Sequence, residues 1–383
     1  MRASLFSAAL VAALVGYGST IALVLAAAAA LGATEAQTGS WIFAICLGKA
    51  AGSVLLSNWT RIPVVLAWST PGAALIAASG GITIEAAVGA FLLAAGLILL
   101  SGLIRPLGRL VSALPVGIAS GMLAGVLLPF CLAVPGHATA LPWLILPVIA
   151  VFAVTRLFNP SLAVLAALAC GLALALADGT RLPVGGMALP ALTLIAPHWS
   201  AGALIGLGLP LYLVSMASQN LPGFAVLQGA GYAPPVSKAL TVTGGISALA
   251  ALFGAHTITM AAITAAICLG DEVHPDKTQR WKVGLIYGAV WVLLGLFGPV
   301  LLATLATLPP ELVAAIAGLA LINPLIGALG SAFGPPDQRF IAGVTLSVAA
   351  SGITVLGVGA AFWGLVAGLA ALALAQAARL VRA

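Results

Sequence analysis

Charged residues are scarce in this chain. Only 6% of its 383 residues are Asp, Glu, Lys or Arg, whereas 62% are hydrophobic. An average soluble domain carries about 25% charged residues, so the composition excludes a soluble globular protein and indicates a polytopic, all-α membrane protein in a lipid bilayer. The net charge of +6 does not indicate a nucleic-acid partner, because the basic residues are spread one or two per loop.

Catalytic and nucleotide-binding motifs are also missing. We find no P-loop, no dinucleotide fingerprint and no paired nucleophile and base, so we expect neither an enzyme nor an ATP-driven pump. The four cysteines lie singly in apolar runs without paired spacing. The charged loop 271–277 contains Asp, Glu and His, but its spacing matches no metal-ligand pattern, and we interpret it as a solvated loop. No cofactor or metal is expected.

What the sequence does contain is a series of apolar runs, and we count fourteen. A membrane-spanning helix needs about 20 apolar residues, and most of these runs approach that length. Two of them, the third and the tenth, are too short. The runs cover residues 5–31, 37–57, 63–78, 84–104, 113–134, 140–157, 161–177, 200–219, 237–253, 256–269, 281–304, 311–330, 338–356 and 360–380.

The distribution of basic residues supports this count. With fourteen spans both termini lie on one side, and that side receives twelve of the fourteen Lys and Arg residues. The other side receives Arg181, and Lys49 falls within a span. Cytoplasmic loops carry the excess of Lys and Arg, so both termini are predicted to be cytoplasmic. The twelve are Arg2, Arg61, Arg105, Arg109, Arg156, Lys238, Lys277, Arg280, Lys282, Arg339, Arg379 and Arg382.

The two stretches that contain these short runs, 63–78 and 254–268, begin 191 residues apart, half the length of the chain. Each starts with bulky or β-branched residues and then becomes rich in small ones, which predicts an extended piece followed by a half-helix. Paired, interrupted hydrophobic segments in corresponding places of two halves are a pointer to a transporter's substrate site. We therefore expect the substrate between residues 63–78 and 254–268.

Polar residues at these two breaks are the first candidates for substrate binding. Half-helix N-termini present backbone N–H groups and a positive dipole end, which suit an anion. The alternative is that the hydroxyl groups only cap helices. The candidate residues are Ser69, Thr70, Pro71 and Gly72 at the first break and Thr257, Thr259 and Met260 at the second.

Two basic side chains lie within predicted spans. His256 stands at the edge of the tenth segment, and its usual pKa lets it exchange a proton near neutral pH; the alternative is a neutral ring bonded to a carbonyl group. Lys49 lies in the second segment, where we favour a stem that snorkels to the membrane surface. No carboxylate lies deep in a span, so cation coordination by a buried Asp or Glu is not expected.

Further polar residues interrupt the eighth and first segments. The eighth ends with the polar run 215–220, which includes Gln219 and Asn220, before a predicted stop at Pro222 and Gly223. Buried amides need partners, so these residues either join helices or face a cavity. Tyr17, Ser19 and Thr20 in the first segment pose the same alternatives, whereas Asn323 and Pro324 look more like a kink.

Several of these stretches resemble the benzoate membrane transport proteins, the BenE family of benzoate:proton symporters. The resemblance covers essentially the whole chain, and its first two stretches are the most specific. The matching stretches are AWSTPGAAL at 67–75, AAITAAIC at 261–268, MASQN at 216–220 with PG at 222–223, HPDK at 274–277 with QRW at 279–281, and AFWGL at 361–365.

The resemblance implies the fold of the nucleobase and sulfate permeases. That fold has seven plus seven inverted spans, here 1–180 and 200–383, with a core and a gate domain drawn from both halves and a possible homodimer. It also implies import of benzoate, or a similar small organic anion, together with protons. Related nucleobase permeases use carboxylates in spans eight and ten. Here Gln219 and residues 256–259 stand instead, which suits an anionic substrate.

We therefore predict a secondary transporter of the inner membrane that imports an aromatic carboxylate with a proton. The carboxylate would bind at Ser69–Gly72 and Thr257–Met260, oriented by Gln219, Asn220 and Tyr17, with His256 as the proton carrier. Alternatively, the substrate crosses as the neutral acid. Another anion or a nucleobase on the same fold, or an anion channel, are the alternative functions.

Overall fold

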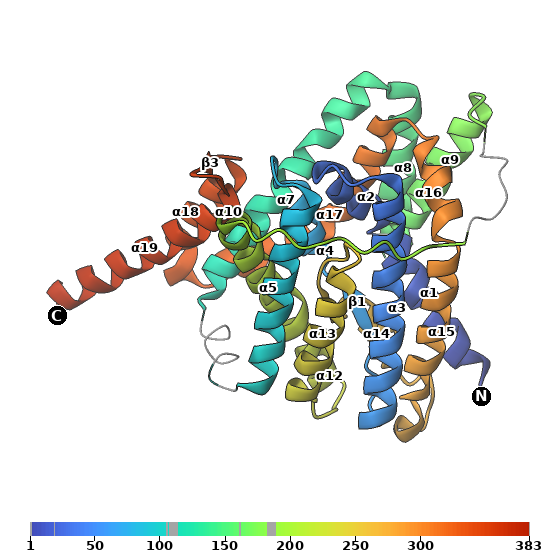
Figure 1. Ribbon diagram of the computed structural model, residues 1–383, viewed down its shortest axis with the longest axis horizontal. Coiled ribbons are helices and arrows are strands. Elements are labelled where there is room, and N and C mark those ends of the chain that lie inside the picture. Colours follow the sequence, from blue (N-terminus) through green and yellow to red (C-terminus); the bar gives the residue numbers. More distant parts are fainter. Residues whose placement is uncertain are drawn as a thin grey trace.

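The computed structural model describes residues 2–18, 20–104, 106, 114–160, 162–181 and 189–382, and the side chains of residues 263 and 379–382 are not included in that description. Ser19, Arg105 and Arg109, which entered the sequence analysis, lie outside the described residues. Apart from four short strands, the regular elements of the described chain are helices (Figure 1).

The elements follow the predicted segments in order. The first half contains α1 (Ala3–Gly18), α2 (Ile21–Ala30), α3 (Glu35–Thr60), β1 (Leu66–Trp68), α4 (Thr70–Ala77), α5 (Ile84–Leu103), α7 (Val116–Ala140), α8 (Pro142–Phe158) and α9 (Ala163–Ala177). The second half begins with α10 (Ala201–Ala203), η1 (Leu204–Gly208), α11 (Leu209–Ser215), η2 (Met216–Asn220), α12 (Leu221–Gly229), α13 (Val236–Ala251), β2 (Ile258–Met260) and α14 (Ile263–Ile267). It continues with η3 (Lys277–Gln279), α15 (Lys282–Leu296), α16 (Gly298–Ala306), α17 (Pro310–Phe333), η4 (Pro336–Gln338), α18 (Arg339–Ala350), β3 (Thr354–Val355), β4 (Val358–Gly359) and α19 (Ala360–Arg382).

Each of the fourteen predicted segments contains at least one of these helices. Within the described residues, seven helical stretches are long and apolar enough to cross a membrane, or eight if α15 and α16, which meet at a bend of 50°, form one broken span. The shorter apolar helices α8, α9 and α13 account for three more segments. The remaining three are α18 and the two interrupted segments.

The helices pack in two groups, and each group takes members from both halves of the chain. In one group, α3 packs against α15 and α13, and α5 packs against α13. In the other, α7 packs against α17, α18 and α19. Figure 1 shows α3 and α15 at one side of the molecule and α18 and α19 at the other. The half-helix α4 contacts α7 of the second group directly, and it contacts α11, which packs against α5 of the first group.

The two interrupted segments meet in an antiparallel pair of strands. Leu66 of β1 pairs with Met260 of β2, and Trp68 pairs with Ile258. Irregular backbone survives at membrane depth only where its polar groups find partners inside the protein. Serines at corresponding positions supply them: the hydroxyl of Ser53 on α3 accepts from the Leu66 amide at 3.0 Å, and Ser247 on α13 accepts from the Ile258 amide at 2.8 Å.

The connection before α10 lies across both halves of the chain. The Thr193 amide donates to the hydroxyl of Ser40 at 2.8 Å, and the His198 amide donates to the Glu85 carbonyl at 2.9 Å. In the second half the Ile195 amide donates to the Leu252 carbonyl at 2.8 Å. Figure 1 shows this extended chain crossing in front of the helices. The described part of the connection, residues 189–200, therefore ties α3, α5 and α13 together.

The charged loop after α14 is ordered by its own side chains. Asp276 caps η3 by accepting from the amide and the hydroxyl of Thr278, and these bonds hold the pKa of its carboxyl below the usual value. Arg280 pairs with Asp271 and donates to the carbonyl of Leu269. Among the described residues no cluster of three His, Cys, Asp or Glu side chains could hold a metal ion.

Two helix boundaries differ from the sequence predictions. The first segment breaks between α1 and α2, next to Gly18, instead of forming one helix over 5–31. The eighth continues through Pro222 and Gly223 to Gly229 instead of ending there. Proline leaves the carbonyl four residues earlier without its helical donor, and the chain adapts with the wide turn η2 immediately before Pro222. The predicted stop is therefore a bulge within one longer helix.

Candidate substrate-binding site

A cavity of about 340 Å³ lies at the start of α4, beside α7 and α17 of the second helix group. Its wall combines α1, α4, α7, the η2 turn, the start of α14 and α17, and the described residues that line it carry no charged side chain. Small-molecule sites are mostly apolar with a few placed polar groups. The lining residues are Val15, Thr70, Pro71, Ser120, Leu123, Pro160, Val164, Ala217, Ser218, Gln219, Pro222, Ala262, Ala320, Asn323, Pro324, Gly327, Ala328 and Ser331.

The first half-helix brings two predicted residues, Thr70 and Pro71, to this cavity. Ser69 is the N-cap of α4 and accepts from the Gly72 amide at 3.1 Å, and Pro71 has no N–H. The free donors of the first turn are therefore fewer than the sequence analysis assumed. Thr70 keeps its hydroxyl at the cavity wall, 2.9 Å from the hydroxyl of Thr20.

Gly72 is not a lining residue, and its role in the structure is close packing. A Cβ atom on Gly72 would lie 2.6 Å from the Cδ1 of Leu211 on α11 and 2.8 Å from the Ser69 hydroxyl. The glycine lets α11 approach the start of α4, which holds the cap and therefore the position of Thr70.

The second half-helix begins later than expected. Thr257 and Thr259 were placed before a helix starting near Met260, but residues 258–260 form β2 and α14 starts at Ile263. The Thr259 hydroxyl donates to the Ala67 carbonyl across the strand pair at 3.3 Å. Of the described residues in this region, only Ala262 lines the cavity, so Thr257, Thr259 and Met260 do not reach it with their side chains.

The polar run at the end of the eighth segment divides between two tasks. Ser218 and Gln219 line the cavity. Asn220 is fully buried, and its Oδ1 accepts from the Met260 amide at 2.9 Å, so it holds the end of β2. The sequence analysis left open whether these residues join helices or face a cavity, and the wide turn η2 lets adjacent residues do both.

Buried hydroxyl groups join the two breaks to the eighth segment. The Ser215 hydroxyl lies 2.7 Å from that of Thr257 and donates to that of Ser69 at 3.2 Å. All three residues are buried, with exposed fractions of at most 1%. In this conformation Ser69 and Thr257 therefore position the breaks and do not line the cavity.

His256 is completely buried, and both of its ring nitrogens have partners. The Trp41 indole N–H donates to Nδ1 at 3.0 Å, which leaves the proton on Nε2, and Nε2 lies 3.2 Å from the Ser69 carbonyl. This is the neutral ring bonded to a carbonyl that the sequence analysis weighed as the alternative. His256 does not line the cavity.

Tyr17 and Lys49 lie together in an aromatic cage that we define as Tyr17, Trp68, Tyr287 and Trp291. The Nζ of Lys49 is 2.9 Å from the ring centroid of Trp291 and 4.2 Å from that of Trp68, and the side chain is 1% exposed. The expectation that Lys49 snorkels to the membrane surface is therefore wrong, because aromatic rings inside the protein surround its end. Tyr17 is not a lining residue of the cavity.

Sequence reasoning missed the contribution of α17. Asn323 and Pro324 were interpreted as a kink, but both line the cavity, together with Ser331 about two turns further along the helix. An amide in the middle of an apolar span was the available signal, since such a group rarely faces lipid. Ser120 on α7 gave no signal of its own.

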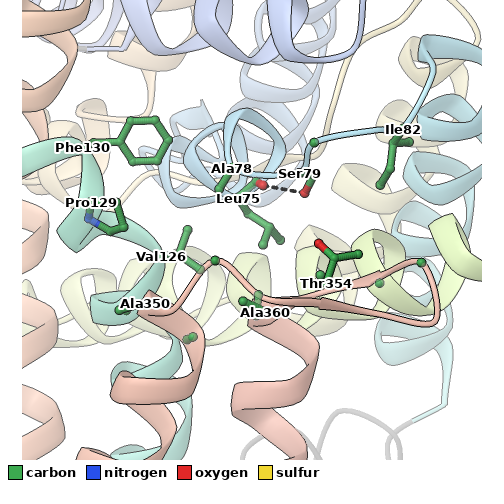
Figure 2. Close-up of a pocket in the computed structure, with 18 residues that line it drawn as sticks. Leu75, Ala78, Ser79, Ile82, Val126, Pro129, Phe130, Ala350, Thr354 and Ala360 are labelled. Atoms are coloured by element: carbon green, nitrogen blue, oxygen red, sulfur yellow. Dashed lines mark hydrogen bonds between the residues drawn. The ribbon is translucent and has the colours of Figure 1, made fainter. Parts of the chain in front are cut away.

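A second cavity, of about 260 Å³, lies at the other end of α4 (Figure 2). Leu75, Ala78 and Ser79 form one side of it, and Val126 and Phe130 of α7 form another. The β3–β4 hairpin and the ends of α18 and α19 close it, through residues such as Thr354, Ala350 and Ala360. α4 and α7 therefore border both cavities, one at each end of the half-helix.

The overall architecture matches solved membrane transporters. The transmembrane domain of a cyanobacterium bicarbonate transporter, BicA, superposes with a TM-score of 0.59 over 96% of this chain and 98% of that chain, at 15% identity. The fold is that of a polytopic membrane protein with fourteen segments in two inverted repeats of seven. This likeness defines the fold class, a polytopic helical membrane protein.

Sequence comparison then gives the family. The sequence profile of the benzoate membrane transport protein matches residues 1–374. The chain is 39% identical to the inner membrane protein YdcO of Escherichia coli (strain K12), over 94% of this chain and 93% of that one. It is 35% identical to the benzoate membrane transport protein of Acinetobacter baylyi (strain ATCC 33305 / BD413 / ADP1), over 95% and 93%. The chain belongs to the benzoate membrane transport protein family.

Proposed function

We propose that this transporter imports an aromatic carboxylate, most specifically benzoate, together with a proton. The observation that carries the proposal is the cavity at the start of α4: it is uncharged, largely apolar, and has hydroxyl and amide groups on separate elements. The positive end of the α4 dipole and the Thr70 hydroxyl suit a carboxylate. The name of the Acinetobacter relative supports the choice of benzoate.

In this proposal the carboxylate binds near Thr70 and Gln219, and the ring lies against apolar side chains. Ala217, Ala262, Ala320 and Leu123 supply apolar surface on three sides of the cavity. None of the eight Asp and Glu residues is buried in the structure, so no carboxylate repels the substrate. Gln219 and Asn323 can donate through their amide groups, and an amide–carboxylate hydrogen bond is worth about 1.5–3 kcal/mol.

We further propose that the substrate moves along α4 and α7 between the two cavities. The group containing α3, α5, α13 and α15 would act as the core domain, and α7, α17, α18 and α19 would belong to the gate domain, so that their relative motion opens one cavity at a time. The repeats would span 1–180 and 200–383, in an inner membrane with both termini in the cytoplasm. A homodimer stays a prediction.

Uptake into proteoliposomes tests this function. Labelled benzoate is offered with an inward proton gradient, with uracil and sulfate as competitors, to wild type and to Thr70→Val. We expect the wild type to show saturable, gradient-driven uptake of benzoate. The competitors should leave this uptake unchanged, and Thr70→Val should lose it. Uptake of a competitor without uptake of benzoate would replace the substrate and leave the fold unaffected.

The same vesicles separate a carrier from an anion channel. A carrier accelerates efflux of labelled benzoate when unlabelled benzoate is present on the opposite side, since the loaded protein returns faster than the empty one. A channel shows no such acceleration and gives a current that does not saturate at low concentration. We expect the carrier result, because the two cavities lie at opposite ends of α4 and share no lining residue.

A further inference from the structure

Lys49 is a basic residue in the middle of α3 with no acidic neighbour. The structure gives its Nζ two aromatic rings, Trp68 and Trp291, and no ion pair or hydrogen bond among the described residues. Removing an ammonium group from water is costly, while the faces of two indole rings offset part of that cost.

The aromatic cage holds a second polar group without a partner. The Tyr17 hydroxyl is buried and has no hydrogen-bond partner among the described residues. Its ring lies 5.6 Å from that of Trp68 and 5.8 Å from that of Trp291, the two rings that contact Lys49. A buried hydroxyl without a partner is rare, and here it shares one cage with an amine that also lacks one.

The cage lies next to the proposed substrate cavity on two elements, α1 and the segment that leads into α4. Tyr17 follows Val15 of the cavity wall by two residues on α1, and Trp68 precedes Thr70 by two residues at the start of α4. A charge on Lys49 therefore acts on a carboxylate in the cavity through low-dielectric protein, where charges interact more strongly than in water. The cavity wall itself supplies no positive side chain.

Besides Tyr17, the titratable groups near Lys49 are a buried cysteine and two side chains that already have hydrogen-bond partners. Cys46 lies one turn away on α3 and is buried, and on α15 the Tyr287 hydroxyl donates to the Leu66 carbonyl at 2.9 Å. His256 has partners on both nitrogens. That His256 carries the proton stays a prediction, but its ring would have to give up a bond to do so, whereas the Lys49 lone pair is unused.

We propose that the Lys49 amine, held between the indole rings of Trp68 and Trp291, takes up and releases the proton that accompanies the substrate. This rests on the proposed function. The neutral amine accepts a proton on one side of the membrane and becomes an ammonium group, and it returns that proton on the other side. No covalent bond of the substrate changes. The ammonium charge balances the substrate carboxylate, so the loaded protein carries no net charge in its interior.

Two transport assays separate this role from a structural one. Exchange of labelled for unlabelled benzoate at equal pH needs only the loaded protein, whereas accumulation driven by a proton gradient also needs the empty, deprotonated protein to return. Lys49→Arg keeps a permanent charge and ring contacts. We expect Lys49→Arg to retain exchange within about threefold of wild type and to lose accumulation by at least about tenfold. The second figure follows because one coupled proton gives a tenfold change in accumulation per pH unit.

Equilibrium binding gives a second readout that does not require transport. Between about pH 6 and 9, where a carboxylic acid is already ionised, wild-type affinity for benzoate should fall as the amine loses its proton, by up to about tenfold per pH unit. Lys49→Met should bind weakly and without this pH dependence. Lys238→Met and Lys238→Arg are the matched controls, because exposed Lys238 lies over the Trp59 ring at 4.5 Å, and they should behave as wild type.

Each outcome decides the proposal. Gradient-driven accumulation by Lys49→Arg at the wild-type level overturns it, and so does unchanged pH dependence of binding in Lys49→Met. If Lys49→Arg is inactive in both transport assays, the binding result for Lys49→Met decides. A wild-type protein that neither binds nor transports benzoate contradicts the proposed function instead, and the same assays are then applied to the anion that it does carry.

Discussion

At the scale of single residues, polar side chains in the membrane interior do two different jobs. Ser69, Ser215 and Thr257 are buried and bond to one another, so they hold the two chain breaks together. Thr70 and Gln219 reach the cavity instead. Neighbouring residues divide in this way because a break or a bulge turns successive side chains in different directions.

Removing the Thr70 hydroxyl should weaken substrate binding. We expect Thr70→Val to raise the half-saturating benzoate concentration by about 10-fold to 100-fold, the equivalent of a lost hydrogen bond to a charged group. Thr70→Ser keeps the hydroxyl and should stay near wild type. Uptake at a series of benzoate concentrations measures both variants, and equal values for valine and serine would remove Thr70 from the site.

Replacing His256 separates its structural role from proton transfer. His256→Gln should leave gradient-driven accumulation in place but reduce stability by about 1–3 kcal/mol, because Trp41 and the Ser69 carbonyl lose a well-placed partner. Thermal unfolding of the purified protein and proton-driven uptake are measured side by side. Loss of accumulation with unchanged benzoate exchange and unchanged stability would favour His256 as the proton carrier over Lys49.

At the scale of elements, small residues set how closely the helices approach. On α13, Gly244 faces α5, and a Cβ atom there would overlap the backbone of Leu99, whereas its neighbour Gly245 has nothing within 4 Å. In a membrane the exclusion of water does not drive helices together, so their packing depends on such close approaches. The α5–α13 contact lies in the helix group that holds β1 and β2, so its integrity bears on the site.

These adjacent glycines offer a matched pair of variants. Gly244→Ala should lower the unfolding temperature by about 1–4 °C, since overpacking costs about 1–3 kcal/mol. Gly245→Ala adds the same methyl group in open space and should be neutral or slightly stabilising, because alanine favours a helix. Thermal unfolding in detergent compares the two. Equal effects would show that α5 does not approach α13 as closely as described.

At the scale of the whole molecule, the fold brings together segments that are nearly 200 residues apart. β1 pairs with β2, and α7 of the first half packs against α17 of the second. The cavity at the start of α4 has walls from both halves of the chain, α1, α4 and α7 from the first and the η2 turn and α17 from the second, so the motion that we propose would change its access. Which side of the membrane each loop faces is then a property of the entire chain, because one added or missing span would move every later loop to the opposite side.

Labelling of single cysteines tests that sidedness. In a variant without the four native cysteines, Lys238→Cys should react with an impermeant maleimide only from the cytoplasmic side, and Arg181→Cys only from the outside. Both positions are exposed in the structure, and the positive-inside distribution gives the direction. Reaction of both cysteines from the same side would contradict the fourteen-span topology.

The sequence by itself determined the membrane environment, the fourteen segments and the two interrupted helices. Each depends on local composition: apolar runs of spanning length, basic loops on one side, and bulky residues before small ones. It also indicated Thr70, Pro71 and Gln219 as candidates for the binding site, because a helix start and an amide in an apolar span are local signals. The inverted repeat was implied by the family resemblance alone, and the likeness to solved transporters confirms it.

Only the tertiary structure decided which polar residues face the cavity and which face one another. The start of α14 depends on strand pairing with residues 66–68, so Thr257 and Thr259 could not be placed from their own surroundings. The position of Lys49 depends on two tryptophans, 19 and 242 residues away in sequence. Contacts between distant segments fix both, and a hydrophobic pattern along one chain carries no information about which distant side chains will meet.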